Sequence, residues 1–246
     1  MSVWWSEVPS VHSPFKGGQE AHRPFPPAGG LAAANDCVAP AANDNEGAKS
    51  RPADPRVKRA FDIVAAICLL IFTAPVLLIT AIAIGLDSRG PILYRQKRIG
   101  LNGAPFHIFK FRSMRRDAEP DGARWASAHD ERITRVGRFI RRTRIDEIPQ
   151  AINILRGEMS FVGPRPERPE FVSVLEKAIA NYHERHTVKP GVTGWAQVRH
   201  CYTASVEGAR EKLVFDMYYI RNYSLALDCR IVLMTFRVAL LGVGSR

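Results

Sequence analysis

Cysteine is scarce in this sequence, and its cysteines are not spaced as metal ligands or as disulfide partners. The chain of 246 residues contains four, without any paired spacing: Cys37, Cys68, Cys201 and Cys229. This pattern is neither a disulfide scaffold nor a zinc motif, and it fits a reducing compartment. His183 and His186 stand three residues apart, but without a third ligand at metal spacing we interpret them as part of a surface helix.

Acidic residues are outnumbered in this chain. There are 24 Asp and Glu against 35 Lys and Arg, so the formal net charge is +11. Such an excess favours nucleic acid, anionic lipid or phosphorylated substrates as partners. A motif with base-reading spacing is missing, and the apolar segment described below favours lipid. We therefore expect membrane lipid, and no nucleic acid, among the partners.

The N-terminal residues 1–55 lack a sustained helical or strand period. They are rich in Pro, Gly, Ala and Asn, a composition that predicts a disordered leader. A basic segment followed by an apolar core is also missing there, so we do not expect a secretory signal.

Charge is absent from residues 63–86, an apolar run of 24 residues that is long enough to cross a bilayer as a helix. Pro75 near its middle should kink or break that helix, and Thr73 could satisfy groups that the proline frees. Basic residues flank both ends, and positive charge marks the cytoplasmic side of a membrane segment. We therefore predict a re-entrant helix-break-helix over residues 56–88. An ordinary kinked span and a buried soluble helix are the alternatives.

Residues 89–246 are predicted to form a cytosolic catalytic domain of the α/β class, mainly helical with a small β-sheet. Two short strands, 92–94 and 106–111, should flank a turn at 100–103. Helices are expected over 131–142, from the carboxylate pair described next to residue 155, and over 169–186. The stretch 228–241 is apolar with basic borders, which fits either an amphipathic helix in the membrane interface or a core helix.

The adjacent carboxylates Asp146 and Glu147 are the candidate catalytic residues. Consecutive helical residues point roughly 100° apart, so this pair cannot flank a sugar ring as glycosidase carboxylates do. Pro149 favours the first turn of a helix, which would place both at a helix N-terminus that also suits phosphate. One carboxylate can attack phosphorus while its neighbour holds Mg²⁺, and both are candidate metal ligands. A pair that merely caps the helix is the alternative.

Cations near this pair favour phosphate chemistry over a simple cap. The candidate phosphate ligands are Lys110, Arg112, Arg141, Arg144 and Arg165. Guanidinium groups bind phosphate oxygens in a bidentate manner. Because prolines stand on both sides of Arg165, its backbone is restricted and its side chain is presented in a narrow range of directions.

Six sequence motifs follow one another over about three-quarters of the chain. They are 58–62 (KRAFD), 109–114 (FKFRSM), 146–150 (DEIPQ), 157–166 (GEMSFVGPRP), 189–198 (KPGVTGWAQV) and 216–220 (DMYYI). In this order they resemble the bacterial sugar transferases called monotopic phosphoglycosyl transferases, or polyprenyl-phosphate hexose-1-phosphate transferases. Residues 204–207 and 241–246 are similar to members that act in exopolysaccharide biosynthesis.

This resemblance implies a reaction and a place in the cell. A hexose 1-phosphate would pass from a UDP-sugar to undecaprenyl phosphate with Mg²⁺ as cofactor and UMP as product, the initiating step of exopolysaccharide or other glycan assembly. The family also implies a re-entrant membrane helix at the cytoplasmic face of the bacterial inner membrane. A homodimer is compatible with these observations. A non-catalytic, membrane-tethered scaffold that binds anions is the alternative function.

The resemblance also implies roles for single residues. Asp146 would be the nucleophile that forms an aspartyl-phosphosugar intermediate, and Glu147 would assist at the metal. Lys110, Arg141 and Arg165 match phosphate-site positions of the family. Arg112 and Gln197 lie in family motifs and complete the candidate substrate-binding residues.

Overall fold

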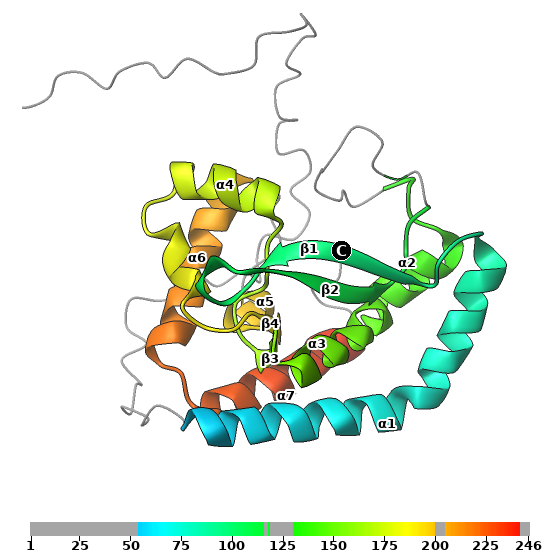
Figure 1. The fold of residues 1–246 in the computed structure, drawn as a ribbon, viewed down its shortest axis with the longest axis horizontal. Coiled ribbons are helices and arrows are strands. Elements are labelled where there is room, and N and C mark those ends of the chain that lie inside the picture. The colour runs from blue at the N-terminus through cyan, green and yellow to red at the C-terminus, as the bar shows by residue number, and fades with distance from the viewer. Residues whose placement is uncertain (1–53, 116–117, 119–129, 200–204, 242–246) are drawn as a thin grey trace, which may run out of the picture. The chain divides into compact units, whose positions relative to one another are not determined.

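The computed structural model describes residues 54–115, 118, 130–199 and 205–241, all of which belong to one compact unit. The leader predicted over residues 1–55 therefore lies outside the described residues, except for its last two positions. The α-helices are α1 (Pro55–Asp87), α2 (Arg135–Arg142), α3 (Ala151–Arg156), α4 (Pro169–Ala178), α5 (Trp195–Arg199), α6 (Val206–Arg221) and α7 (Leu225–Leu241). The predicted class, mainly helical with a little β-structure, is confirmed (Figure 1).

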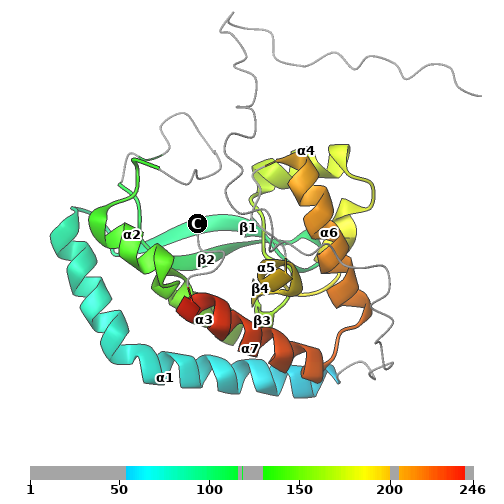
Figure 2. The ribbon, with the colours of Figure 1, turned by 180° about the vertical axis from the view of Figure 1, so that it is seen from behind.

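α1 is a helix of 33 residues that bends in its second half (Figures 1 and 2). The Asp54 side chain accepts a hydrogen bond from the Arg56 N–H at 2.8 Å and caps its start. Pro75 lies inside the helix, where it removes one backbone donor and bends the axis. The backbone is helical on both sides of Pro75. The structure therefore has a bend in a continuous helix where the sequence predicted a kink or a break. The Thr73 hydroxyl donates to the Leu69 carbonyl at 2.6 Å.

Apolar side chains cover the outside of α1. Phe72 is 80 % exposed and Leu86 is 85 % exposed. Among the described residues α1 is the one helix long and apolar enough to cross a membrane, and only 11 % of its most apolar stretch is buried. A core helix of a soluble protein would be mostly covered, so that alternative is wrong.

The strands form two small sheets. β1 (Leu93–Ile99) and β2 (Pro105–Phe111) pair as an antiparallel hairpin, with Tyr94 opposite Lys110 and Arg98 opposite Phe106. Two strands around a turn were expected, but β1 continues five residues beyond the predicted end at residue 94. The turn between them is the 3₁₀ helix η2 (Leu101–Gly103). β3 (Ser160–Val162) pairs in parallel with β4 (Gly191–Thr193). α3 packs between the hairpin and α1, and Ala66, Ile108 and Ile154 share one core cluster there.

The predicted helix over 169–186 is wrong as a single element. α4 ends at Ala178, and the 3₁₀ helix η4 (Tyr182–His186) follows. Ile179 is extended, and Asn181 adopts a left-handed conformation at φ 60°, which asparagine tolerates better than most residues. Arg185 and His186 are buried, so the surface-helix interpretation of this segment is also wrong. α2 begins at Arg135, four residues after the predicted start.

α7 lies beside the first half of α1 (Figures 1 and 2). Its Ile231 is fully buried in a cluster with Trp195 and Tyr219, whereas Leu233 is 71 % exposed and Phe236 is 60 % exposed. The helix therefore packs against the core on one side and presents apolar side chains on another. Its place in the membrane interface stays a prediction.

Lys58 joins α1 to the rest of the fold through buried charges. Its Nζ lies 3.0 Å from the Asp62 carboxylate and 2.8 Å from the Asp228 carboxylate of α7. Asp62 also accepts hydrogen bonds from the Phe161 N–H at 3.0 Å and the Ser160 hydroxyl at 3.1 Å. One buried cation therefore contacts both carboxylates, and this cluster ties α1 to both β3 and α7.

Lys58→Met should destabilise the fold strongly, because it leaves two buried carboxylates without their cation. We expect a loss of about 3–5 kcal/mol in the free energy of unfolding, measured by denaturant unfolding in detergent with tryptophan fluorescence. Arg56→Met, an exposed position on the same helix, is the control and should change stability by less than about 0.5 kcal/mol. Equal effects of the two substitutions would contradict this role of Lys58.

Candidate active site

A left-handed residue places the two carboxylates. α2 ends at Arg142, and Arg144 then adopts φ 60°, a conformation that costs a non-glycine residue about 1 kcal/mol. The 3₁₀ helix η3 (Ile145–Gln150) starts there and runs directly into α3. Asp146 and Glu147 lie in its first turn, and both are buried. The predicted placement at the N-terminal end of a helical segment is therefore confirmed.

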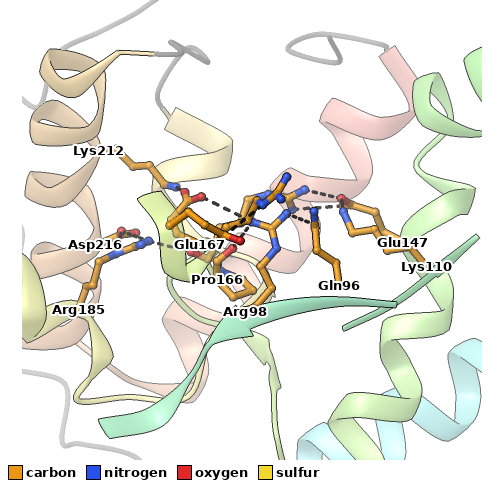
Figure 3. Close-up of polar contacts among 12 residues, drawn as sticks. Gln96, Arg98, Lys110, Glu147, Pro166, Glu167, Arg185, Lys212 and Asp216 are labelled. Carbon is orange, nitrogen blue, oxygen red and sulfur yellow. Dashed lines mark hydrogen bonds and ion pairs between the residues drawn. The ribbon is translucent and has the colours of Figure 1, made fainter. Parts of the chain in front are cut away.

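Glu147 is surrounded by cations from three segments. The Lys110 Nζ of β2 lies 2.7 Å from Oε1 (Figure 3). The Arg165 guanidinium donates to both carboxylate oxygens, and Arg144 lies 3.8 Å from Oε2. Burial alone would raise the pKa of Glu147, but Arg165 and Lys110 outweigh it and hold the pKa well below its ordinary value. Glu147 is therefore ionised and fully engaged.

Asp146, the residue directly before Glu147, lacks such partners. Within the part of the chain that the structure describes, no hydrogen bond or ion pair reaches its carboxylate. Burial and the neighbouring charge of Glu147 raise the pKa of Asp146 to about 6, while Lys110, Arg141 and Arg165 act in the other direction. A buried carboxylate without a partner, close to three cations, is suited to attack an electrophile that those cations bind.

The structure brings together most of the predicted site residues. Lys110 and Arg165 contact Glu147, and Arg141 is close enough to lower the pKa of Asp146. Arg112 lies elsewhere: its guanidinium donates to the carbonyls of Ser88 and Pro91 at 2.5 and 2.6 Å. These contacts tie the end of α1 to the start of the hairpin and favour a structural role for Arg112.

The hydrogen bond that Gln197 makes is also not to the carboxylate pair. Its Nε2 donates to the Val192 carbonyl at 3.1 Å, beside the start of α5. Its Oε1 is buried without a hydrogen-bond partner among the described residues. The role of Gln197 in substrate binding stays a prediction.

A buried polar network surrounds Pro166 and Glu167 (Figure 3), and the sequence does not predict it. Its members include Arg98 of β1, Glu167, and the Arg185–Asp216 ion pair. The strand alternation held a signal for Arg98, because Arg98 and Lys110 lie on the same face of the hairpin once the register is known. No local signal marks Arg185, whose partner Asp216 lies 31 residues further along the chain.

The two carboxylates differ in how well they suit Mg²⁺ coordination. Mg²⁺ is typically bound by one or two carboxylates together with substrate phosphates. No cluster of three or more His, Cys, Asp or Glu occurs within the described residues, so phosphate oxygens would have to complete the coordination. Asp146 has free oxygens and fits such a site. Glu147 fits only if Lys110 and Arg165 move from its oxygens to a phosphate.

The contrast between the carboxylates predicts opposite effects on stability. Asp146→Asn removes an unpaired buried charge and should stabilise the metal-free protein by about 2 kcal/mol at pH 7. Glu147→Gln leaves Lys110 and Arg165 without their counter-charge and should destabilise it by about 3 kcal/mol. Thermal unfolding in a chelator-containing buffer measures both effects. A loss of stability in both variants would contradict the assigned states.

The effect of Asp146→Asn should depend on pH with a definite sign. The folded pKa of about 6 lies above the ordinary value of 3.8, so folding binds a proton between these values. Stability linked to Asp146 is therefore present at low pH and is lost as the pH rises through about 6. The gain from Asp146→Asn should be full above pH 6 and vanish near pH 4. A gain that does not change with pH would contradict this assignment.

Comparison with known proteins identifies the family. Residues 53–242 match the model of the bacterial sugar transferase family. The chain is 47 % identical over 190 residues to a UDP-N-acetylgalactosamine-undecaprenyl-phosphate N-acetylgalactosaminephosphotransferase of Aeromonas hydrophila, covering 77 % of this chain and 45 % of the relative. It is 43 % identical over 181 residues to a UDP-glucose:undecaprenyl-phosphate glucose-1-phosphate transferase of Escherichia coli, covering 73 % and 39 %.

A shorter relative is matched over most of its length. The chain is 42 % identical over 185 residues to the exopolysaccharide production protein PSS of Rhizobium leguminosarum, covering 73 % of this chain and 92 % of the relative. By contrast, the chain spans less than half the length of the two relatives described above. The match over residues 53–242 contains the site and all six motifs, and the chain belongs to the bacterial sugar transferase family.

Proposed function

We propose that this protein transfers a hexose 1-phosphate from a UDP-sugar to undecaprenyl phosphate, releases UMP, and forms a covalent intermediate on Asp146. The observation that carries this proposal is the pair of adjacent carboxylates in opposite states, one bound by cations and one buried without a partner. The relatives, which are named as undecaprenyl-phosphate sugar phosphotransferases, support the same substrates. The reaction would initiate exopolysaccharide or other glycan assembly.

In the first step a carboxylate oxygen of Asp146 attacks the phosphorus that carries the sugar. A bond forms between this oxygen and phosphorus, and the bond from phosphorus to the bridging oxygen breaks. UMP leaves with the bridging oxygen, so no proton has to be supplied. The position of Asp146 favours this attack, because no protein group within the described residues occupies its carboxylate oxygens, while Lys110, Arg141 and Arg165 lie near enough to lower its pKa.

In the second step a phosphate oxygen of undecaprenyl phosphate attacks the same phosphorus. The bond between phosphorus and Asp146 breaks, the lipid diphosphate sugar forms, and the carboxylate is regenerated. A two-step route lets a soluble donor and a lipid acceptor use one site in turn. The exposed apolar surface of α1 would hold the site at the membrane where the acceptor resides.

Lys110 and Arg165 would bind the phosphate oxygens during both steps. The Glu147 carboxylate occupies their donors, much as a phosphate would. A diphosphate that enters would compete for the same N–H groups. Glu147 would therefore hold Lys110 and Arg165 in place between turnovers. After product release both cations would bind Glu147 again. When bound, Mg²⁺ would neutralise diphosphate charge, with Asp146 and the substrate as ligands.

Turnover tests the proposed reaction directly. The detergent-purified protein is incubated with Mg²⁺, undecaprenyl phosphate and a panel of UDP-sugars, and released UMP is measured. We expect UMP release with at least one donor, dependence on the lipid for repeated turnover, and loss on addition of a chelator. Asp146→Asn should lower the rate by at least about 10³-fold, since it removes the nucleophile.

Arg56→Met serves as the control and should keep the wild-type rate. A folded Asp146→Asn variant that turns over at the wild-type rate would exclude the covalent route. Binding of UDP-sugar without UMP release from any donor would favour the anion-binding tether instead.

The membrane arrangement that we propose is re-entrant, with both ends of α1 on the cytoplasmic face and α7 in the interface. Arg56 and Arg89, at the two ends of the bent helix, are exposed, and basic residues at both ends favour one common side. Single cysteines at positions 56 and 89, in a cysteine-free background, should both resist an impermeant thiol reagent in intact cells. Labelling of one position only would establish a kinked span instead.

A further inference from the structure

Arg165 stands between two prolines, which leaves its segment short of backbone donors. Pro164 and Pro166 have no N–H, so the segment cannot join a sheet through regular hydrogen bonding. Its position must be fixed mainly through its carbonyl oxygens. A segment fixed in this way depends on donors supplied by other parts of the chain.

Four consecutive carbonyls of this segment accept hydrogen bonds from four different donors. The Gly191 N–H donates to Pro164 O and the Ile99 N–H to Glu167 O, both at 3.0 Å. The two central carbonyls, those of Arg165 and Pro166, accept hydrogen bonds from side chains. The Arg185 Nη2 donates to Arg165 O at 2.8 Å, and the Arg98 Nη1 donates to Pro166 O at 3.1 Å.

Arg185 is held rigidly for this task. Its side chain is 1 % exposed, and its Nε and Nη2 donate to one Asp216 oxygen at 3.1 and 2.8 Å. Its Nη1 donates to the Tyr182 hydroxyl at 3.0 Å. The guanidinium is thus fully engaged by α6, by η4 and by the carbonyl of Arg165, and lysine could not reproduce this set of contacts.

Arg98 supports the segment from the hairpin. Its Nη2 donates to Gln96 at 2.6 Å, and its Nη1 also lies 3.7 Å from Glu167 (Figure 3). Glu167 in turn accepts from Lys212 of α6 at 2.6 Å. β1 and α6 therefore hold the proline-flanked segment from two directions.

We infer that Arg98 and Arg185 are positioning residues, which fix the main chain around Arg165 so that its guanidinium points at Glu147 and at the phosphate beside Asp146. This inference rests on the proposed function for its catalytic consequence. A displacement of about 1 Å at a substrate-orienting group can cost about 100-fold in rate, so two carbonyl contacts far from the chemistry matter for turnover.

Kinetics of Arg185→Lys and Arg98→Lys test the inference. Each keeps a positive charge but loses the guanidinium geometry. We expect kcat to fall by about 10- to 100-fold in each variant, with the KM for UDP-sugar within about threefold of wild type. Arg210→Lys, an exposed arginine on α6, is the matched control and should keep the wild-type kcat.

A double-substitution cycle separates positioning of Arg165 from a general structural role. In an Arg165→Ala background, Arg185→Lys or Arg98→Lys should lower the residual rate by less than about twofold, because the group they position is gone. The same loss in both backgrounds would overturn the inference. Arg98→Lys serves alone if Arg185→Lys does not fold.

A stability cycle tests the same point without any turnover. Arg165→Ala should lower the melting temperature of the wild-type protein, since Glu147 loses its main partner. It should lower the melting temperature less in the Arg98→Lys background, where the pair is already displaced. Equal shifts in both backgrounds would overturn the inference, whether or not the protein is active. A lack of transferase activity in the wild-type protein would by itself count only against the proposed function.

Discussion

The buried carboxylate of Glu147 is the constraint on which the site depends. A carboxylate so far from water is stable in its charged form only if cations approach it closely. Lys110 and Arg165 satisfy that need from two separate segments, the β-hairpin and the proline-flanked loop. Charge balance therefore draws together three parts of the chain and places two cations beside the carboxylate pair.

A second buried charge cluster connects this domain to its apolar helix. Lys58 lies between Asp62 and Asp228, and Asp62 accepts hydrogen bonds from β3. The start of α1 is therefore fixed to α7 by an ion pair and to β3 by hydrogen bonds. The outer surface of α1 is then free to remain uncovered. Apolar packing for the membrane and ionic contacts for the domain thus occupy different sides of one helix, and the bend at Pro75 lies beyond the ionic contacts.

The sequence predicts features that depend on residues close together in the chain, and it misses contacts between residues far apart in the chain. The hairpin and the placement of the carboxylate pair rest on local patterns, namely strand alternation, a turn and consecutive residues, and these predictions agree with the structure. Lys110 and Arg165 lie beside Glu147, and their roles as phosphate ligands stay predictions. His183 and His186 suggest a surface helix, because a third ligand at metal spacing is missing. Arg185, which lies between them, is nevertheless buried and pairs with Asp216, 31 residues further along the chain. A single sequence cannot tell which distant opposite charges meet.

The two adjacent carboxylates differ because the 3₁₀ turn directs them to different surroundings. Glu147 points into the cations, and Asp146 shares their field without a direct contact. If both carboxylates were paired with cations, no carboxylate oxygen would be free to attack. If neither were paired, like charges at this burial would favour protonation and leave a weak nucleophile. One paired and one unpaired carboxylate keep the cations close while one oxygen stays available. This division of roles makes the support of Arg165 by Arg98 and Arg185 relevant to the chemistry.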